Sequence, residues 1–221
     1  SRNSIDQPIF PRQGTQVSLT LQLTPPYSLM DGIDDYSGLT SQEKYRWSEF
    51  HKWKFKVSWF TRLVGNLVLN TRVQYGFLGR YNNKLDITPF ERFSLGGSGL
   101  SGFNLYGTEI IALRGYPDNS LSASTGSTVF NKYTFELRYP LSLNPSATIY
   151  GLGFMEAGNA WDGFDQFKPF DIKRSAGLGV RIFLPMFGLL GFDYGYGFDS
   201  VPGLAGPSKW QPHFIIGYSV D

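Results

Sequence analysis

Residues 52–59, which read KWKFKVSW, place polar and apolar side chains at strictly alternating positions. Trp53, Phe55 and Trp59 occupy odd-numbered positions, and three lysines occupy even-numbered positions. A repeat of two residues is that of a β-strand, in which successive side chains point to opposite faces of the sheet. Basic residues interleaved with aromatic ones also suit a surface that follows a nucleic-acid backbone and stacks on its bases. The rest of the chain decides between these two interpretations.

The charge of the chain argues against nucleic acid. Its 221 residues include 20 lysines and arginines against 18 aspartates and glutamates, which gives a net charge of +2. A protein that binds nucleic acid usually carries a pronounced basic patch or stripe. We therefore expect no nucleic-acid partner, and the alternation in residues 52–59 indicates a strand.

The same alternation recurs along the chain. It predicts strands in residues 16–23, 52–59, 66–77, 132–139, 172–182, 190–199 and 213–220. Residues 147–161 are also strand-like, but they alternate poorly. These segments give about eight strands, each close to the ~9–11 residues that cross a bilayer when a strand is tilted. No comparable helical pattern is present in the sequence.

The composition is typical of a membrane barrel. Aromatic residues make up 17% of the chain and there are 26 glycines, yet the mean hydropathy is only −0.20. This combination is expected when one face of every strand is polar and the other meets lipid. A soluble β-sandwich would show the same alternation, so periodicity alone does not separate the two.

The connections favour the membrane barrel. Short links at residues 64–66, 140–145 and 185–188 separate longer links at 24–50, 79–129, 162–170 and 200–211. Short periplasmic turns that alternate with long outer loops are characteristic of outer-membrane barrels. We therefore predict an all-β fold, an antiparallel transmembrane β-barrel, with both chain ends on the periplasmic side.

The alternation also predicts which side chains meet lipid. Trp53, Phe55, Trp59, Phe192, Tyr194 and Tyr196 are expected to face lipid. The lysines between them would face water in the lumen, because a basic residue on the lipid face costs about 2–4 kcal/mol at the midplane. The link at 79–129 is far longer than an ordinary loop. If it folds inward, the barrel must be wider than eight strands; otherwise it lies outside.

Several motifs resemble one family. IDQPIFPRQG precedes the first strand, TPPYSL follows it, GGSGLSG and LRGYPD occur in the long link, and HFIIGYSV is the final strand. Together they resemble the BamA family of outer-membrane assembly factors, whose relatives include TamA, two-partner-secretion transporters and organelle import pores. The resemblance implies that residues 1–221 are the second half of a sixteen-stranded barrel. It also implies that the first eight strands and the periplasmic POTRA domains are not in this chain.

The resemblance further implies a contact between the long link and the barrel wall. In the family the link folds into the lumen, where its arginine pairs with acidic residues. The matching positions are Arg114, Gly115 and Tyr116 in the link, with Glu136 and Glu156 as the acidic partners. A guanidinium offers a rigid fork of donors that two carboxylates can satisfy. From residue types alone, Arg114 could equally be an ordinary solvated loop arginine.

The final strand carries the second site that the resemblance implies. In the family the first and last strands meet at a weak seam that opens for client strands. The matching residues are Phe214, Ile216, Gly217 and Tyr218, and glycine would let the strand bend because it tolerates strained backbone. The alternative is that Gly217 is simply a small residue facing a crowded lumen.

The expected function is non-enzymatic. The chain has no cysteine, and its two histidines, His51 and His213, match no nucleophile motif or metal spacing, so we expect no cofactor and no metal. The resemblance implies an insertase in the bacterial outer membrane. Its partners would be nascent β-barrel proteins, the lipid bilayer with lipopolysaccharide, and accessory subunits. The alternatives are a protein-translocation pore of the same superfamily, or a passive barrel closed at eight strands with the long link outside.

Overall fold

The structure is a computed structural model that describes residues 1–33, 35–100, 107–201 and 206–217. Its strands are β1 (Arg2–Asn3), β2 (Gly14–Leu23), β3 (His51–Arg62), β4 (Val68–Gly79), β5 (Phe93–Leu95), β6 (Glu109–Ile111), β7 (Val129–Asn144), β8 (Ala147–Trp161), β9 (Lys173–Leu184), β10 (Gly188–Ser200) and β11 (Pro207–Gly217). Short helical turns are η1 (Tyr27–Leu29), α1 (Ser41–Lys44) and η2 (Phe164–Gln166). No helix among the described residues is long and apolar enough to cross a membrane.

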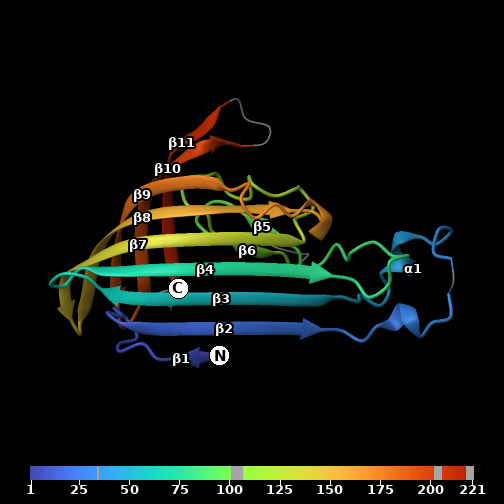
Figure 1. Ribbon diagram of the computed structural model, residues 1–221, viewed down its shortest axis with the longest axis horizontal. Helices are drawn as coiled ribbons and strands as arrows, with labels where there is room; N and C mark the ends of the chain where they lie inside the picture. Colours follow the sequence, from blue (N-terminus) through green and yellow to red (C-terminus); the bar gives the residue numbers. More distant parts are fainter. Residues whose placement is uncertain (34, 101–106, 202–205, 218–221) are drawn as a thin grey trace.

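Nine strands form one antiparallel sheet in the order β1-β2-β3-β4-β7-β8-β9-β10-β11. Every long strand that the sequence predicts is present, including the poorly alternating one at β8. The sheet curves strongly, so it has a concave and a convex face (Figure 1). In the described residues β1 and β11 are the two edges of the sheet, so the passive cylinder closed at eight strands is wrong.

Two predicted links are shorter than expected. The predicted turn at residues 140–145 is mostly strand, because β7 runs on to Asn144 and β8 begins at Ala147. The pairing register shifts between Pro140 and Ser142, which suits a proline that has no N–H to donate. The link predicted at 200–211 shrinks because β11 already begins at Pro207.

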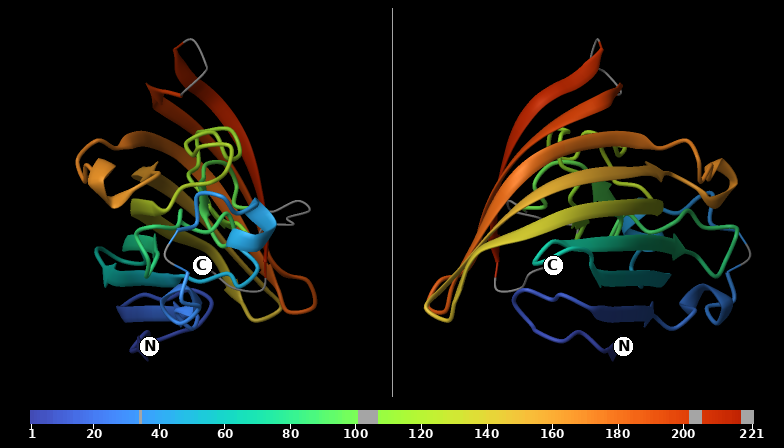
Figure 2. Two further views of the ribbon diagram at one scale, coloured as in Figure 1. Left: turned by 90° about the vertical axis from the view of Figure 1, so that its right-hand side faces the viewer. Right: turned by 60° about the vertical axis from the view of Figure 1, so that its left-hand side comes forward.

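The long segment, residues 80–128 between β4 and β7, lies against the concave face (Figure 2). Its two short strands, β5 and β6, pair in parallel. Phe93, Leu95 and Leu113 of this segment are fully buried against Leu78 of β4 and Phe130 of β7. The segment therefore folds inward, and the alternative that it lies outside the sheet is wrong.

A second apolar cluster fills the concave face near the short turns. Phe10 from the N-terminal segment packs edge-on against Tyr150 of β8, with their ring centroids 5.2 Å apart. Phe60, Val68 and Leu152 complete its centre. The two clusters lie on either side of the charged residues described below.

The convex face carries the aromatic residues that the sequence assigned to lipid. Trp53, Phe55, Trp59, Phe192 and Tyr194 are all between 41% and 60% exposed. Tyr196 shares their face but is half-buried, since the rings of Phe198 and Trp210 pack beside it at 5.4 and 5.5 Å. The polar parity of the same strands points to the concave face.

Candidate functional site: the Arg114 cluster

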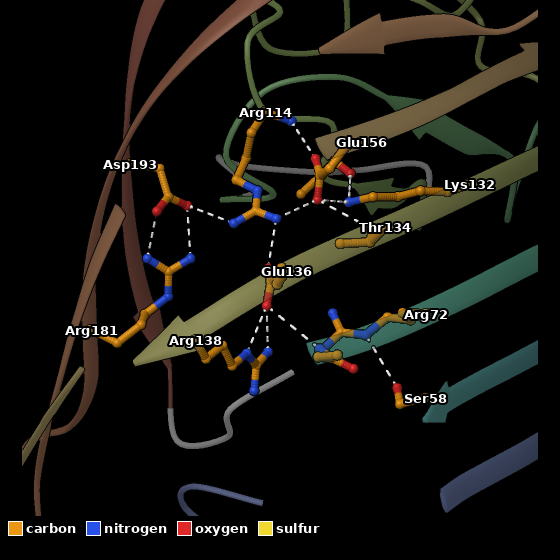
Figure 3. A network of polar contacts seen from close by, with 12 residues as sticks. Ser58, Arg72, Arg114, Lys132, Thr134, Glu136, Arg138, Glu156, Arg181 and Asp193 are labelled. Carbon is orange, nitrogen blue, oxygen red and sulfur yellow. Dashed lines mark hydrogen bonds and ion pairs between the residues drawn. The ribbon is translucent and has the colours of Figure 1, made fainter. Parts of the chain in front are cut away.

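Arg114 reaches from the long segment into a group of carboxylates on the concave face (Figure 3). Its Nη2 atom donates to Oε1 of Glu136 at 2.6 Å and to Oε1 of Glu156 at 2.7 Å. Its Nη1 atom donates to Oδ2 of Asp193 at 3.2 Å. The three acids come from β7, β8 and β10, so one guanidinium links three strands of the sheet to the segment.

Each carboxylate also has a cation of its own on the wall. Arg138 donates to Glu136 through Nε at 2.8 Å, and Arg181 holds Asp193 through two bonds of 2.6 and 2.7 Å. Lys132 lies 2.9 Å from Glu156. We call these seven residues the Arg114 cluster: Arg114, Lys132, Glu136, Arg138, Glu156, Arg181 and Asp193.

The cluster is almost completely closed to solvent, with no member more than 6% exposed as a residue. Four cations face three carboxylates, and each carboxylate accepts hydrogen bonds from Arg114 and from a cation of the wall. Burial lowers the pKa of Arg114, but Glu156, Glu136 and Asp193 outweigh this and raise it above its ordinary value. A buried network of this kind fixes geometry, because removal of one partner leaves the others charged and unsatisfied.

The backbone of the segment is held at the same place. The Arg114 N–H donates to Oε2 of Glu156 at 2.9 Å, and the Gly115 N–H donates to Nε2 of His213 at 2.8 Å. The Tyr116 hydroxyl donates to the Arg174 carbonyl at 2.6 Å. Burial raises the pKa of Tyr116 to about 12, so this hydroxyl keeps its proton at physiological pH.

Glycines allow the segment to lie directly on the wall. Gly115 has φ +88°, and a Cβ there would meet Ser175 Cβ and the Tyr196 carbonyl carbon at 2.9 Å. From the other side, a Cβ on Gly197 would lie 2.5 Å from the Gly115 oxygen. Side chains on both surfaces are absent where the two backbones meet, which explains part of the glycine content on the polar parity of β10.

Strand β8 reverses the usual alternation. Tyr150, Leu152 and Phe154 point to the concave face together with Glu156, as the sequence required for Glu156 to reach the lumen. Phe154 lies under the Arg114 guanidinium, 3.8 Å from its carbon to the ring centroid. The large residues of β8 thus support the cation from below, while glycines take the convex positions at 151 and 153.

The structure therefore brings together the sequence-predicted residues Arg114, Gly115, Tyr116, Glu136 and Glu156. Sequence reasoning missed Asp193 and His213 as members of this contact, and it did not identify Lys132 as a neighbour of Glu156. It was also wrong about Lys52 of β3, which does not face water: it is only 1% exposed and pairs with acids of the long segment.

The seam residues lie at the opposite edge of the sheet from β1. Phe214 and Ile216 point to the convex face at 62% and 67% exposure, and the Phe214 ring packs 5.2 Å from Phe192 of β10. Gly217 pairs with Leu189 at the end of β11. Tyr218 lies outside the described residues, and the bend expected at Gly217 stays a prediction.

The sequence model described as the Omp85 superfamily domain matches residues 1–219 of this chain. The chain belongs to the Omp85 superfamily. No curated protein sequence matches it. The Omp85 fold explains why a polar concave face and an aromatic convex face occur on one curved sheet, since this is the arrangement of an outer-membrane barrel.

A solved Omp85-type barrel has the same fold. The crystal structure of BamA from Haemophilus ducreyi lacking POTRA domains 1-3 aligns with a TM-score of 0.67 at 15% sequence identity. The alignment covers 96% of this chain and 41% of that chain. This chain therefore spans about two-fifths of the length of the BamA chain it matches, and the likeness establishes the fold alone.

Proposed function

We propose that this chain is the C-terminal half of the barrel of an Omp85 insertase, which folds and inserts β-barrel proteins into the bacterial outer membrane without chemical catalysis. The observation that carries the proposal is the Arg114 cluster, which holds a long inward segment across β7, β8 and β10. A passive barrel has no need of a segment fixed in this way across an open sheet.

The sheet edges support the other part of the proposal. An unpaired strand edge cannot persist in hydrocarbon, because each unsatisfied backbone N–H or C=O costs several kcal/mol. In the described residues β1 pairs with only Val17 and Gln16 of β2, and β11 pairs on one side with β10. We propose that the preceding barrel strands cover these edges and that client strands pair with β11 when the seam opens.

The proposed partners follow from these surfaces. Nascent β-barrel proteins would supply the client strands, and the convex aromatic face would contact the bilayer and its lipopolysaccharide. Accessory subunits of a BAM-type assembly complex would bind other parts of the full-length protein. No partner of nucleic-acid type is proposed.

A translocation pore is the second candidate, because the Omp85 superfamily domain is common to insertases and to secretion pores. The TPPYSL motif favours the insertase. In a pore, the long segment would have to leave the concave face to open a channel. The cluster opposes that movement.

Depletion of the full-length protein in its own host tests the choice. An insertase predicts that several unrelated porins disappear from the outer membrane together. A pore predicts that porin levels hold while one secreted protein accumulates in the periplasm. Complementation with the wild-type protein should restore porins, whereas complementation with Arg114→Glu should not. Normal porin levels during depletion would rule the insertase out.

A further inference from the structure

The long segment is held at a second place, on β3. Glu91 precedes β5, and Glu109 begins β6, so the parallel pairing of these two short strands brings the two carboxylates together. Opposite them, Lys52 Nζ lies 3.1 Å from Glu91 Oε2 and 3.0 Å from Glu109 Oε2. Lys54 Nζ also lies 3.0 Å from Glu109 Oε2.

This second contact is built rather than incidental. The Lys52 side chain is 1% exposed, whereas the two acids are about one-third exposed at 35% and 31%. The Lys52 ammonium also lies 4.8 Å from the ring centroid of Phe93, which is fully buried. A buried ammonium needs acceptors close by, and these two acids of the segment are within 3.1 Å of it.

The wall is shaped for the same approach. Gly76 of β4 pairs with Lys54, and a Cβ at Gly76 would lie 2.1 Å from an atom of the Phe130 ring and 2.8 Å from the Phe93 ring. The missing side chain leaves room for Phe93 at the start of β5. The short strands of the segment can therefore lie against β4 beside the two lysines.

The two contacts have opposite polarity. At the Arg114 cluster the segment supplies a cation to three wall acids, each of which also has a wall cation. At β3 the segment supplies two acids and the wall supplies two lysines. A segment inserted in the reverse orientation would place Arg114 against Lys52 and Lys54, which would then lack the acids that pair with them. Like-charge contacts of this kind select against the wrong arrangement.

We propose that Lys52 and Lys54 are positioning residues that form a second anchor for the long segment with Glu91 and Glu109. The opposite polarities of the two anchors fix the orientation in which the segment enters the barrel. The anchor acts on β5 and β6, and the Arg114 cluster acts on residues 114–116. This inference does not depend on whether the full-length protein is an insertase or a pore.

Hydrogen exchange read by mass spectrometry, on the full-length protein in detergent, tests the proposal. Lys52→Glu with Lys54→Glu should speed exchange in peptides covering β5 by about tenfold or more, because a buried pair is broken. Peptides covering residues 114–117 should keep wild-type exchange. Adding Glu91→Lys and Glu109→Lys should restore protection of β5, since the pairs re-form with reversed sign.

If charge reversal at the buried Lys52 prevents assembly, two milder variants keep the test decisive. Lys54 is partly exposed and Lys52 is buried, so Lys54→Gln should speed exchange of β5 less than the double reversal does, and Lys52→Gln should speed it more than Lys54→Gln does. Lys173→Glu, a lysine reversal on β9 outside both anchors, is the matched control and should leave β5 unchanged. Wild-type protection of β5 in the lysine variants, or failure of the reversed pairs to restore it, would overturn the proposal.

Discussion

The Nη2 atom of Arg114 lies 2.6 Å from Oε1 of Glu136, and both side chains are 5% exposed. The two residues belong to different parts of the fold, the inward segment and the wall strand β7. A charge pair closed to solvent on both sides depends on each partner for its stability, since a single buried charge left alone costs several kcal/mol.

Arg114→Ala should destabilise the barrel by about 1–3 kcal/mol, because each acid keeps its wall cation but loses its hydrogen bond from the guanidinium. Arg114→Glu should be worse, because it adds a fourth carboxylate to three. Glu136→Arg should restore Arg114→Glu only in part, since Glu156 and Asp193 still lack their shared partner. The measurement is the temperature at which the barrel loses its compact gel mobility, together with its level in the outer membrane.

Arg174→Ala is the control for these variants. Arg174 pairs with Asp199 at a largely exposed position, its side chain 64% exposed, so its loss should change stability by less than about 1 kcal/mol. Wild-type mobility and porin levels for Arg114→Ala would show that the cluster has no such role.

Gly115→Ala should prevent the segment from seating. The φ of +88° is unfavourable for alanine at about 1–3 kcal/mol, and the added Cβ would meet Ser175 and Tyr196 at 2.9 Å. Gly65→Ala has the same kind of strain, with φ +60°, but nothing lies within 4 Å of its Cβ. A thermal comparison of the two variants separates backbone strain from contact, and equal effects would contradict the packing described for Gly115.

His213 should matter as an acceptor. His213→Phe removes the partner of the Gly115 N–H, and a buried donor left without an acceptor costs about 1–3 kcal/mol. His213→Gln keeps an acceptor oxygen and should retain more of the wild-type stability. Hydrogen exchange at residues 114–117 measures the effect directly. If Phe and Gln behave alike at that peptide, the hydrogen bond contributes nothing.

The strand pattern was predictable from the sequence because alternation is local: it shows which side chains of a strand share one face of the sheet and which share the other. It succeeded even for the faces of β3 and β10. It was weakest for β8, where large apolar residues such as Phe154 point inward to support Arg114. The large residues of β8 point inward because Arg114 of the folded segment packs on Phe154. In the sequence, the only sign of this was that Glu156 has the same spacing as these large residues.

The rest of the site needed the structure because its partners are far apart in the chain. Asp193 lies 79 residues from Arg114, at an ordinary polar position of a regular strand, and nothing local marks it as a partner. Lys52 was expected in water for the same reason. The acids that cover it, Glu91 and Glu109, were visible in the sequence, but their meeting depends on the parallel pairing of β5 and β6.

The central claim is that the convex face meets lipid and the concave face surrounds the pinned segment. Because the 221-residue chain has no cysteine, single cysteines can be introduced along β2 and labelled with a fluorophore in the full-length protein, reconstituted with nitroxide-labelled lipid. Quenching should be strong at the convex positions 19, 21 and 23 and weak at the concave positions 18, 20 and 22. Equal quenching at the convex-face and concave-face positions, or quenching at the concave-face positions alone, would contradict the account.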